Sequence, residues 1–591
     1  MGYLKSIGTV IIYVSFFLAV ITFLPGIPPE AEYSEYSMKL PWDLQTLKSV
    51  TRIRLQDPEI LFSGKIKGPE AFASFNGEIY TGIRGGYVVQ IEENRIKPIV
   101  KFGQKCDGLW QEQKCGRPLG LKFNDKGELF VADSYYGIFK VNVNTRQYIN
   151  IINSSEPIDG KIPRVVNSLD IAKNGDIYWT DSSIDFPLHD STYAFLANPS
   201  GRLIRYNAAT KKNEVLVKNI GFANGVLLSD DESFLIVLSS LNSCIIKYNI
   251  KGSKAGQKEI FAEGLPGLPD NVHSDGQGGF LVTFIFTVDS EHPLLAQSLI
   301  PHPHIRKMLS RLLYSIEAPF KLLQDIYPNY YSERVLYTVG SFELSRNILL
   351  KSDSIILRMD KTGKILNVLY SEDTDITEIS SAYIHNGYLW FGSPWKEYIM
   401  RVPLKQAFPD LALNTKPLAK KEQKQEEPLL TVSATPNIKV EAKSTKSTKS
   451  TVKQEATTKL PPKSTVKAQT TQKPNSDATR PKETIQKSTT SQPTTTSSTT
   501  TPKPTTSSPK ASEKYSKEIK KDKSNSQVKP ETSQQSNEAR IKTKSEDSVK
   551  KNDHETQTSK FKLILIVLFY SMLKVLHIPN ISIYLLGFMK L

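Results

Sequence analysis

Histidine, tryptophan and cysteine are scarce in this chain. Its 591 residues include 8 His, 5 Trp and 3 Cys. The few cysteines and histidines never take the spacing of a zinc site, and the sequence has no Gly-x-Ser-x-Gly nucleophile elbow and no glycine-rich phosphate loop. These absences argue against the common zinc, serine-hydrolase and nucleotide-binding classes.

Excess positive charge is nearly absent from the first 410 residues. The chain carries +16 in total, from 76 Lys+Arg and 60 Asp+Glu. Residues 411–560 hold 30 Lys+Arg and 16 Asp+Glu, a net of +14, which leaves +2 for everything else. A folded reader of nucleic acid concentrates basic residues on its globular domain. We therefore expect no nucleic-acid partner.

Long hydrophobic runs occur only at the two ends. Residues 7–24 carry no charge and would rise about 27 Å as a helix, close to the hydrocarbon thickness of a bilayer. Lys5 precedes this run and Glu30 follows it, which predicts a type II signal-anchor in residues 1–26 with the rest of the chain extracellular or lumenal. The alternative is a cleaved signal peptide. Residues 27–51 form a juxtamembrane segment in this interpretation.

The C-terminal hydrophobic segment, residues 561–591, is less regular. Its apolar run from Leu563 to Leu573 is interrupted by Lys574 and later by Pro579. Two interpretations stay open, a second membrane segment or the removed tail of a lipid-anchor signal.

Apolar periodicity is missing from residues 405–560. Within them, residues 488–508 contain 16 Ser/Thr in 21 positions, interrupted mainly by proline. Such a stretch cannot bury enough apolar surface to fold. Outside the cell it would be an O-glycosylated, mucin-like tail; the alternative is an unmodified disordered linker.

What the sequence does contain is a repeated β pattern. The segment from Cys115 to Val141 has three short apolar runs separated by turn signals, with Asn124-Asp125-Lys126-Gly127 as the first turn. A meander of this size cannot bury both faces by itself. It therefore predicts that copies of the pattern stack against one another.

Six copies follow one another at a period of roughly 40 to 55 residues, apart from an insertion in the fifth. They begin at Glu70, Pro118, Val166, Ala223, Pro269 and Ile379. Radial repetition of four-stranded sheets leaves few open edges. We therefore predict an all-β fold, a six-bladed β-propeller over residues 52–404; the alternative is an open β-solenoid.

The insertion in the fifth repeat has helical spacing of apolar residues between His302 and Leu323. Two positions are compatible with it. The helix either packs over one end of the propeller or leans on a membrane.

Side-chain oxygens recur at one phase of the repeat, at the start of the first strand, where a propeller's channel lies. The positions that carry them are Glu70, Asn167, Asn224, Asp270 and Asn271. Two anionic and several neutral oxygens suit Ca²⁺. Residues of these types also form turns at strand ends, which is the alternative explanation.

Other candidate residues stand alone. His273 lies near the same phase and is a candidate general base. Cys106 and Cys115 flank a short loop and either close a disulfide or remain reduced, whereas Cys244 falls in a strand as a buried apolar residue. Asn153 begins an N-glycosylation sequon, Asn153-Ser154-Ser155.

Several motifs resemble the strictosidine synthase-like family over roughly residues 40 to 405. The motifs are Gly68-Pro69-Glu70, Cys115-Gly116-Arg117-Pro118-Leu119-Gly120-Leu121, Val131-Ala132-Asp133-Ser134-Tyr135-Tyr136-Gly137, Tyr178-Trp179-Thr180-Asp181-Ser182-Ser183, Gly221-Phe222-Ala223-Asn224-Gly225-Val226 and Leu268-Pro269-Asp270-Asn271-Val272. The resemblance implies a six-bladed propeller, a Cys106–Cys115 bond and kinship with calcium-dependent lactonases and arylesterases. In those relatives, the residues that match Glu70, Asn167, Asn224, Asp270 and Asn271 hold the catalytic calcium.

The sequence also departs from the family pattern. The fourth repeat has Leu238-Ser239-Ser240 where an Ala-Glu-Thr-like strand end is common, and the last repeat offers Glu378 and Ser380 with no aligned catalytic glutamate. A Pictet–Spengler condensation is therefore not expected.

Two functions remain in consideration. The first is a calcium-dependent esterase or lactonase that acts on a small-molecule ester. The second is a non-catalytic, mucin-like surface glycoprotein whose propeller binds a carbohydrate or lectin ligand. Both predict a protein attached to the membrane by its N-terminal helix.

Overall fold

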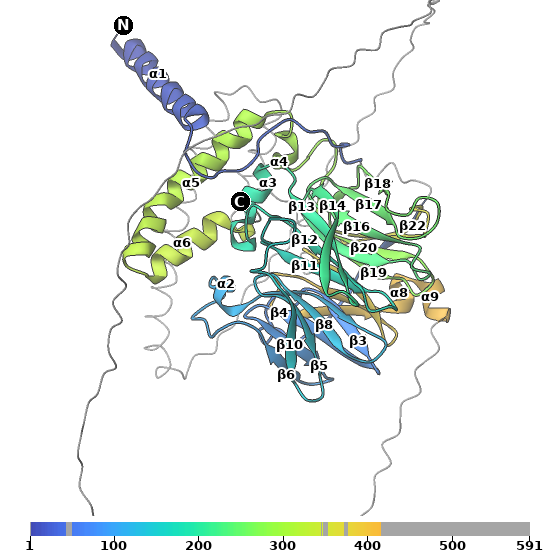
Figure 1. Cartoon of the computed structure of the whole chain (residues 1–591). Helices are drawn as coiled ribbons and strands as arrows, with labels where there is room; N and C mark the ends of the chain where they lie inside the picture. Colours follow the sequence, from blue (N-terminus) through green and yellow to red (C-terminus); the bar gives the residue numbers. More distant parts are fainter. Residues whose placement is uncertain (1, 43–49, 344–345, 347–352, 372–375, 415–591) are drawn as a thin grey trace, which may run out of the picture. The chain divides into compact units, whose positions relative to one another are not determined.

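The computed structural model describes residues 2–42, 50–343, 346, 353–371 and 376–414 (Figure 1). The predicted tail beyond residue 414 and the hydrophobic segment 561–591 lie outside the described residues, so those expectations stay predictions.

Strands dominate the described part of the chain and form six sheets, five of four strands and one of five. The first three sheets are β3 (Phe72–Phe75), β4 (Glu78–Ile83), β5 (Tyr87–Ile91) and β6 (Ile96–Lys101); β7 (Pro118–Phe123), β8 (Leu129–Asp133), β9 (Gly137–Val141) and β10 (Tyr148–Asn153); and β11 (Val166–Ile171), β12 (Ile177–Asp181), β13 (Gly201–Asn207) and β14 (Lys212–Ile220). The fourth is β15 (Ala223–Leu228), β16 (Phe234–Ser239), β17 (Cys244–Asn249) and β18 (Lys258–Ala262).

The last two sheets each take a strand from the N-terminal region. The fifth has β19 (Gly267–Ser274), β20 (Phe280–Thr287), β21 (Ser354–Met359) and β22 (Ile365–Ser371), with β1 (Thr51–Arg54) parallel to β22. The sixth has β23 (Ser381–His385), β24 (Tyr388–Gly392) and β25 (Ile399–Pro403), with β2 (Glu59–Leu61) antiparallel to β25. Sequence reasoning missed both N-terminal strands.

Local chemistry explains the turns that separate the strands. Between β7 and β8, the Asn124 side chain accepts hydrogen bonds from the backbone N–H groups of Lys126 and Glu128, at 3.1 and 2.9 Å. Gly127 takes a φ of 76°, a conformation that side chains disfavour. The strand–turn–strand pattern predicted for residues 115–141 is therefore confirmed.

The first strands of the sheets contact one another in a closed sequence. β3 contacts β7, which contacts β11, then β15, β19 and β23, and β23 returns to β3. The apolar core lies between neighbouring sheets; one cluster, for example, packs Tyr80 and Val88 of the first sheet against Leu129 and Val131 of the second. This is a propeller-type arrangement, in which the first strands surround a central channel.

The folded part continues past the predicted end of the propeller. Two short helices, α8 (Leu404–Ala407) and α9 (Pro409–Asn414), follow β25. Leu404, Phe408 and Leu411 are buried in the core beside the last sheet. Residues 405–414, which we expected to begin the disordered tail, therefore belong to the folded unit.

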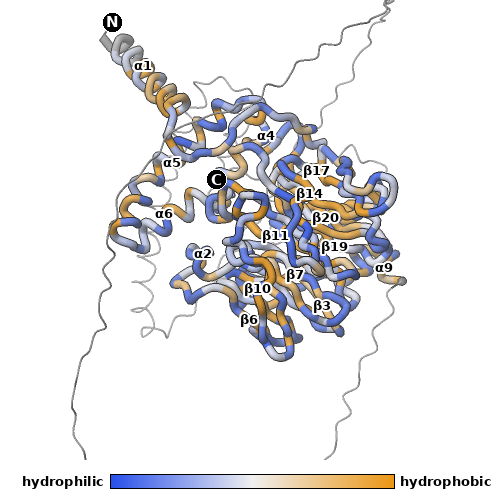
Figure 2. The backbone as a smooth tube through the Cα atoms, in the orientation of Figure 1, coloured by the Kyte–Doolittle hydropathy of each residue, from blue (hydrophilic) through white to orange (hydrophobic). Residues whose placement is uncertain are grey.

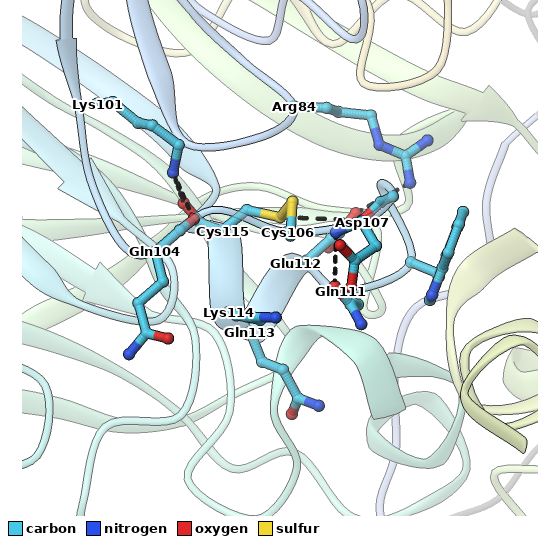
Figure 3. Close-up of a disulfide and its surroundings, with 12 residues drawn as sticks. Arg84, Lys101, Gln104, Cys106, Asp107, Gln111, Glu112, Gln113, Lys114 and Cys115 are labelled. Atoms are coloured by element: carbon cyan, nitrogen blue, oxygen red, sulfur yellow. Dashed lines mark hydrogen bonds and ion pairs between the residues drawn. A yellow bond between two sulfur atoms is a disulfide. The ribbon is translucent and has the colours of Figure 1, made fainter. Parts of the chain in front are cut away.

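A disulfide joins Cys106 to Cys115, with their Cα atoms 5.5 Å apart (Figure 3). Cys115 ends the short helix α2 (Glu112–Cys115). Cys244 is free and buried. The structure thus confirms the bond that the family resemblance implied, and it leaves no exposed thiol among the described residues.

Several helices outside the sheets pack against one another. The N-terminal helix is α1 (Gly2–Phe23), and the helices near the third sheet are η2 (Leu188–Asp190) and α3 (Ser191–Leu196). The insertion of the fifth repeat forms α4 (Leu295–Ser298), α5 (Pro303–Ile326) and α6 (Tyr330–Gly340), which confirms the predicted helix. Within the described residues, none of the helices combines the length and the apolar character that a membrane span requires.

Candidate metal site in the central channel

Four of the five predicted ligands lie at irregular points of the first strands, and the fifth, Glu70, comes just before β3. The pairing register shifts between Val166 and Leu169, between Ala223 and Val226, and between Pro269 and Val272. These three intervals contain Asn167, Asn224, and the pair Asp270 and Asn271. A bulge bends the strand and re-aims its side chains, so the repeated polar residues mark repeated bulges where the first strands meet.

Glycine allows the first strands to approach closely at this level. A Cβ on Gly225 would lie 2.8 Å from the carbonyl oxygen of Asp270, and one on Gly120 would lie 2.7 Å from that of Asn167. Any larger residue would push the neighbouring strand away. The two glycines of the family motifs therefore keep the ligand-bearing strands together.

Serine hydroxyls fix the orientation of the two asparagine amides. Asn167 Nδ2 donates to Ser182 Oγ at 3.0 Å, and Asn224 Nδ2 donates to Ser240 Oγ at 3.2 Å. Because each NH₂ group is held, each amide oxygen is left available. The Asn224 oxygen is buried and has no hydrogen-bond partner, which is costly unless a ligand satisfies it.

These serines are in turn fixed by the next sheet. Ser182 Oγ donates to the carbonyl of Ala223 at 2.6 Å, and Ser240 Oγ donates to that of Pro269 at 2.5 Å. Ser240 belongs to the strand end that departs from the family pattern, and the structure gives it the role of supporting Asn224.

The two buried carboxylates of this region, Glu70 and Asp270, both have raised pKa values. Burial raises the pKa of Glu70 to about 7, although the charge of Arg117 opposes the rise. Burial, followed by the charge of Glu70, holds the pKa of Asp270 well above its usual range. The Arg117 guanidinium lies 3.1 Å from a Glu70 oxygen and is itself 3% exposed. Arg117 therefore pairs directly with one of the two buried acids, Glu70.

The donor set fits a divalent cation. Among the described residues, no three His, Cys, Asp or Glu side chains form a metal-binding group. Ca²⁺ would accordingly be held by the two carboxylates of Glu70 and Asp270 together with neutral amide oxygens, a mixture that this ion accepts. Asn224 offers the clearest neutral donor, because its oxygen is buried and unsatisfied.

Asn271 is a weaker candidate for a metal ligand than Asn224. Its backbone N–H donates to the Ser380 carbonyl at 3.1 Å and to Thr283 Oγ1 at 3.2 Å, which ties the fifth sheet to the sixth. Its side-chain Nδ2 is buried without a partner. Its assignment as a ligand stays a prediction.

Sequence reasoning missed the residues that support the ligands. Arg117 was quoted only as part of a motif, yet it is the charge partner of Glu70. Buried threonines on the second strands, Thr180 and Thr283, bind the backbone beside the bulges. Their recurrence after an apolar pair, as in Tyr178-Trp179-Thr180 and Leu281-Val282-Thr283, was the available signal.

His273 does not join this group. It follows Asp270 by three residues, roughly 10 Å along an extended strand, and its Nε2 lies 2.8 Å from Ser381 Oγ. Together with Lys122 and Tyr383 it lines a cavity of about 330 Å³ between the first strands, and none of the five predicted ligands lines this cavity. Burial and the charge of Lys122 lower the pKa of His273 to about 3, far from the value that suits a general base at neutral pH.

Helices α2 and α6 cover the region around Glu70. Glu112 on α2 accepts hydrogen bonds from Tyr337 on α6, at 3.0 Å, and from Arg84, at 3.1 Å. Glu112 also acts electrostatically on Glu70. The disulfide loop around α2, drawn in Figure 3, therefore connects the helical insertion to the candidate site.

The glycosylation candidate lies apart from the channel. Asn153 ends the outer strand β10 and is exposed, and its side chain accepts a hydrogen bond from the Ser155 N–H at 3.1 Å. An exposed position is compatible with modification, which stays a prediction.

Known proteins share this combination of sheets and motifs. The sequence profile described as Strictosidine synthase matches residues 167–253, which run from the Asn167 bulge to just beyond β17 of the fourth sheet. The Drosophila melanogaster protein named "Adipocyte plasma membrane-associated protein Hemomucin" is 37% identical over 415 residues, which cover 69% of this chain and 71% of that protein. The chain belongs to the strictosidine synthase-like family.

The resemblance extends to vertebrate proteins. The Rattus norvegicus adipocyte plasma membrane-associated protein is 31% identical over 356 residues, or 60% of this chain and 87% of the relative. Among solved structures, a gluconolactonase from Xanthomonas campestris aligns with 64% of this chain and 99% of its own length, at 13% identity and a TM-score of 0.37.

Proposed function

We propose that this chain is a membrane-attached, six-bladed β-propeller that holds Ca²⁺ in its channel and hydrolyses small-molecule esters or lactones. One observation supports the metal more than any other. Burial raises the pKa of both Glu70 and Asp270, the charge of Glu70 adds to the cost of ionising Asp270, and the amide oxygen of Asn224 has no hydrogen-bond partner. A divalent cation would satisfy all three groups at once.

The chain's own residues would prepare the site. Ser182 and Ser240 hold the asparagine amides so that their oxygens need no reorientation. Arg117 balances part of the carboxylate charge. When bound, Ca²⁺ would supply Lewis-acid polarisation of a substrate carbonyl. Preorganised oxygens of this kind lower the reorganisation needed when charge develops in the transition state.

Membrane attachment is the second part of the proposal. The names of the relatives describe a plasma membrane-associated protein. The helix α1 leaves a series of large apolar side chains exposed, among them Ile12, Tyr13 and Phe16 at about 70%. Lys5 before the apolar run and Glu30 after it favour the type II orientation, with the sheets extracellular or lumenal.

A non-catalytic function is the second candidate. The position of His273 favours it, because the cavity that His273 lines includes none of the predicted ligands and its lowered pKa, about 3, lies far from the value that suits a general base at neutral pH. In that case the propeller of a surface glycoprotein would bind a carbohydrate or lectin ligand, and the channel metal would be structural.

Hydrolysis assays separate the two functions. We expect the purified full-length protein to hydrolyse aryl esters or lactones, and we expect EGTA to abolish turnover, because the substrate carbonyl would lose its Lewis acid. Asn224→Ala should lose turnover by about 10²-fold or more, the effect of losing one preorganised electrostatic group.

An exposed amide provides the matched control. Asn144→Ala, on the turn after β9, should leave turnover unchanged. Calcium binding without any turnover would reject the enzyme and leave the non-catalytic candidate.

A further inference from the structure

A compact group of exposed hydrophobic side chains lies where α5 passes into α6. Six of the ten residues in positions 322–331, here called the elbow, are large, hydrophobic and exposed: Leu322 at 61%, Leu323 at 45%, Ile326 at 74%, Tyr327 at 69%, Tyr330 at 53% and Tyr331 at 78%. In the rest of the described chain, outside residues 10–24, exposed large hydrophobics occur singly or in pairs. Contiguous apolar patches mark interaction surfaces.

The sequence of α5 explains why only this end is exposed. In its first half, Met308, Leu309 and Arg311 are buried against the protein. In its last turns, Leu322 and Ile326 share one face, because residues four apart lie above one another on a helix, and Tyr327 follows directly as the C-cap residue. The apolar stripe therefore continues along the helix after the protein that covered it has ended.

The elbow is nevertheless held in a fixed conformation. The Asn329 side chain caps α6 by accepting a hydrogen bond from the Ser332 N–H at 2.9 Å. Gln324 accepts one from the Asn329 N–H at 3.0 Å. Glu333 on α6 accepts hydrogen bonds from Trp110 and Gln111 of the disulfide loop, at 3.1 and 2.7 Å. These bonds fix the backbone of the elbow, so its apolar side chains stay exposed in one arrangement.

The same helix is fastened to α1. The Arg311 guanidinium is buried and donates to the carbonyls of Ile21, Thr22 and Leu24, at 2.8, 3.1 and 2.9 Å. Carbonyls at a helix C-terminus lack partners within the helix and carry partial negative charge, so Arg311 fixes this end of α1 to α5. Figure 1 shows α1 projecting away from α5, and Figure 2 shows the hydrophobic residues along α1 in orange.

We propose that the elbow inserts into the headgroup–acyl boundary of the same bilayer that α1 enters. The composition supports a bilayer as the occupant. Three of the six side chains are tyrosines, whose rings are apolar and whose hydroxyls are polar, and such side chains concentrate at membrane interfaces. Continuity with α1 supports it further, because α5 joins both apolar surfaces within one folded unit.

Insertion of the elbow would orient the channel relative to the bilayer. Since α6 binds α2 through Tyr337 and Glu112, and Glu112 acts on Glu70, docking of the elbow would hold the covered end of the channel near the lipid surface. This inference rests on the membrane attachment proposed for α1, and the experiment below distinguishes the two.

A single fluorescent label tests the insertion. Because Cys106 and Cys115 are bonded and Cys244 is buried, the Ile326→Cys variant of the full-length protein presents one reactive thiol. The labelled protein is reconstituted in phosphatidylcholine–phosphatidylserine vesicles that contain a lipid spin-labelled near the headgroup. Interfacial side chains lie about 5–10 Å into this boundary, so we expect the fluorescence to fall by about half or more. Aqueous iodide should quench it correspondingly less than in detergent.

The Ile260→Cys variant is the matched control, because Ile260 is 58% exposed on the outer strand β18, away from the elbow. Its label should remain open to iodide and insensitive to the spin-labelled lipid. If the protein floats with the vesicles but the label at position 326 behaves like the one at position 260, the elbow proposal is wrong and the attachment stands. If the protein does not float, both are wrong. Protection of position 326 from iodide together with insensitivity to the spin-labelled lipid would mean that protein covers the elbow, which also overturns the proposal.

Discussion

The Asp270→Asn variant should be more stable than the wild-type protein in EGTA, yet gain nothing from calcium. Burial and the charge of Glu70 make the ionised Asp270 unfavourable in the metal-free protein. An amide of the same shape removes that charge. We expect the free energy of unfolding to rise by about 1–3 kcal/mol, the usual cost of a buried, uncompensated polar group.

The two proteins should respond to calcium in opposite ways. A ligand at one hundred times its dissociation constant stabilises the native state by about 2.7 kcal/mol. Wild type should gain this amount in saturating calcium, whereas Asp270→Asn, which lacks one of two anionic ligands, should not change. Urea unfolding with EGTA and with calcium measures both quantities.

A charge-matched control excludes a general effect of removing one acid. Asp125 is exposed in the turn between β7 and β8, so Asp125→Asn should keep both the stability and the calcium response of wild type. An Asp270→Asn protein that is less stable in EGTA and still stabilised by calcium would refute the proposed role of Asp270.

Of the substitutions proposed, we expect Asp181→Ala to lower the free energy of unfolding most. Asp181 is fully buried, and one of its oxygens accepts hydrogen bonds from Arg202 Nε and Nη2, at 3.0 and 2.7 Å. Its other oxygen accepts from the backbone N–H groups of Arg164 and Val165. Removal of one partner leaves a buried guanidinium uncompensated, which costs about 3–5 kcal/mol.

An exposed ion pair provides the comparison. Asp159 pairs with Lys218, and both side chains are more than half exposed. Exposed pairs contribute about 0–1 kcal/mol, so Asp159→Ala should change the unfolding free energy little. Similar losses in the two variants, measured by urea unfolding, would contradict the role assigned to the buried pair.

Much of the fold was visible in the sequence because it repeats. Each predicted repeat corresponds to one observed sheet, and the long insertion in the fifth was correctly bridged, with β21 starting at the predicted Ser354. Local turn chemistry and alternating apolar runs are encoded within a few residues of one another, which makes such patterns readable.

The pairing of N-terminal strands with the last sheets could not be predicted from the sequence. β2 pairs with β25 by placing Glu59 opposite Arg401, across more than 300 residues of sequence. A short strand of three residues has no distinctive pattern, and its partner can be identified only in the folded chain. The same applies to Arg117, whose role depends on how close the first two sheets place it to Glu70.

The sequence predicted which position of each repeat carries the candidate ligands, but not how far along the channel each side chain lies. Repeat alignment placed Asn167, Asn224 and Asp270 at equivalent bulges, and the structure agrees. It also suggested His273, because three residues are a small difference in an alignment. In an extended strand the same three residues place a side chain at a different level of the channel, where His273 binds Ser381.

Anomalous diffraction from calcium-soaked crystals of the protein tests the central claim most directly. We predict one strong peak in the channel, with oxygens of Glu70, Asp270 and Asn224 within about 2.3–2.6 Å of it. A channel without such a peak, in which Asn224 Oδ1 remains without a ligand and Glu70 is paired only with Arg117, would contradict the account.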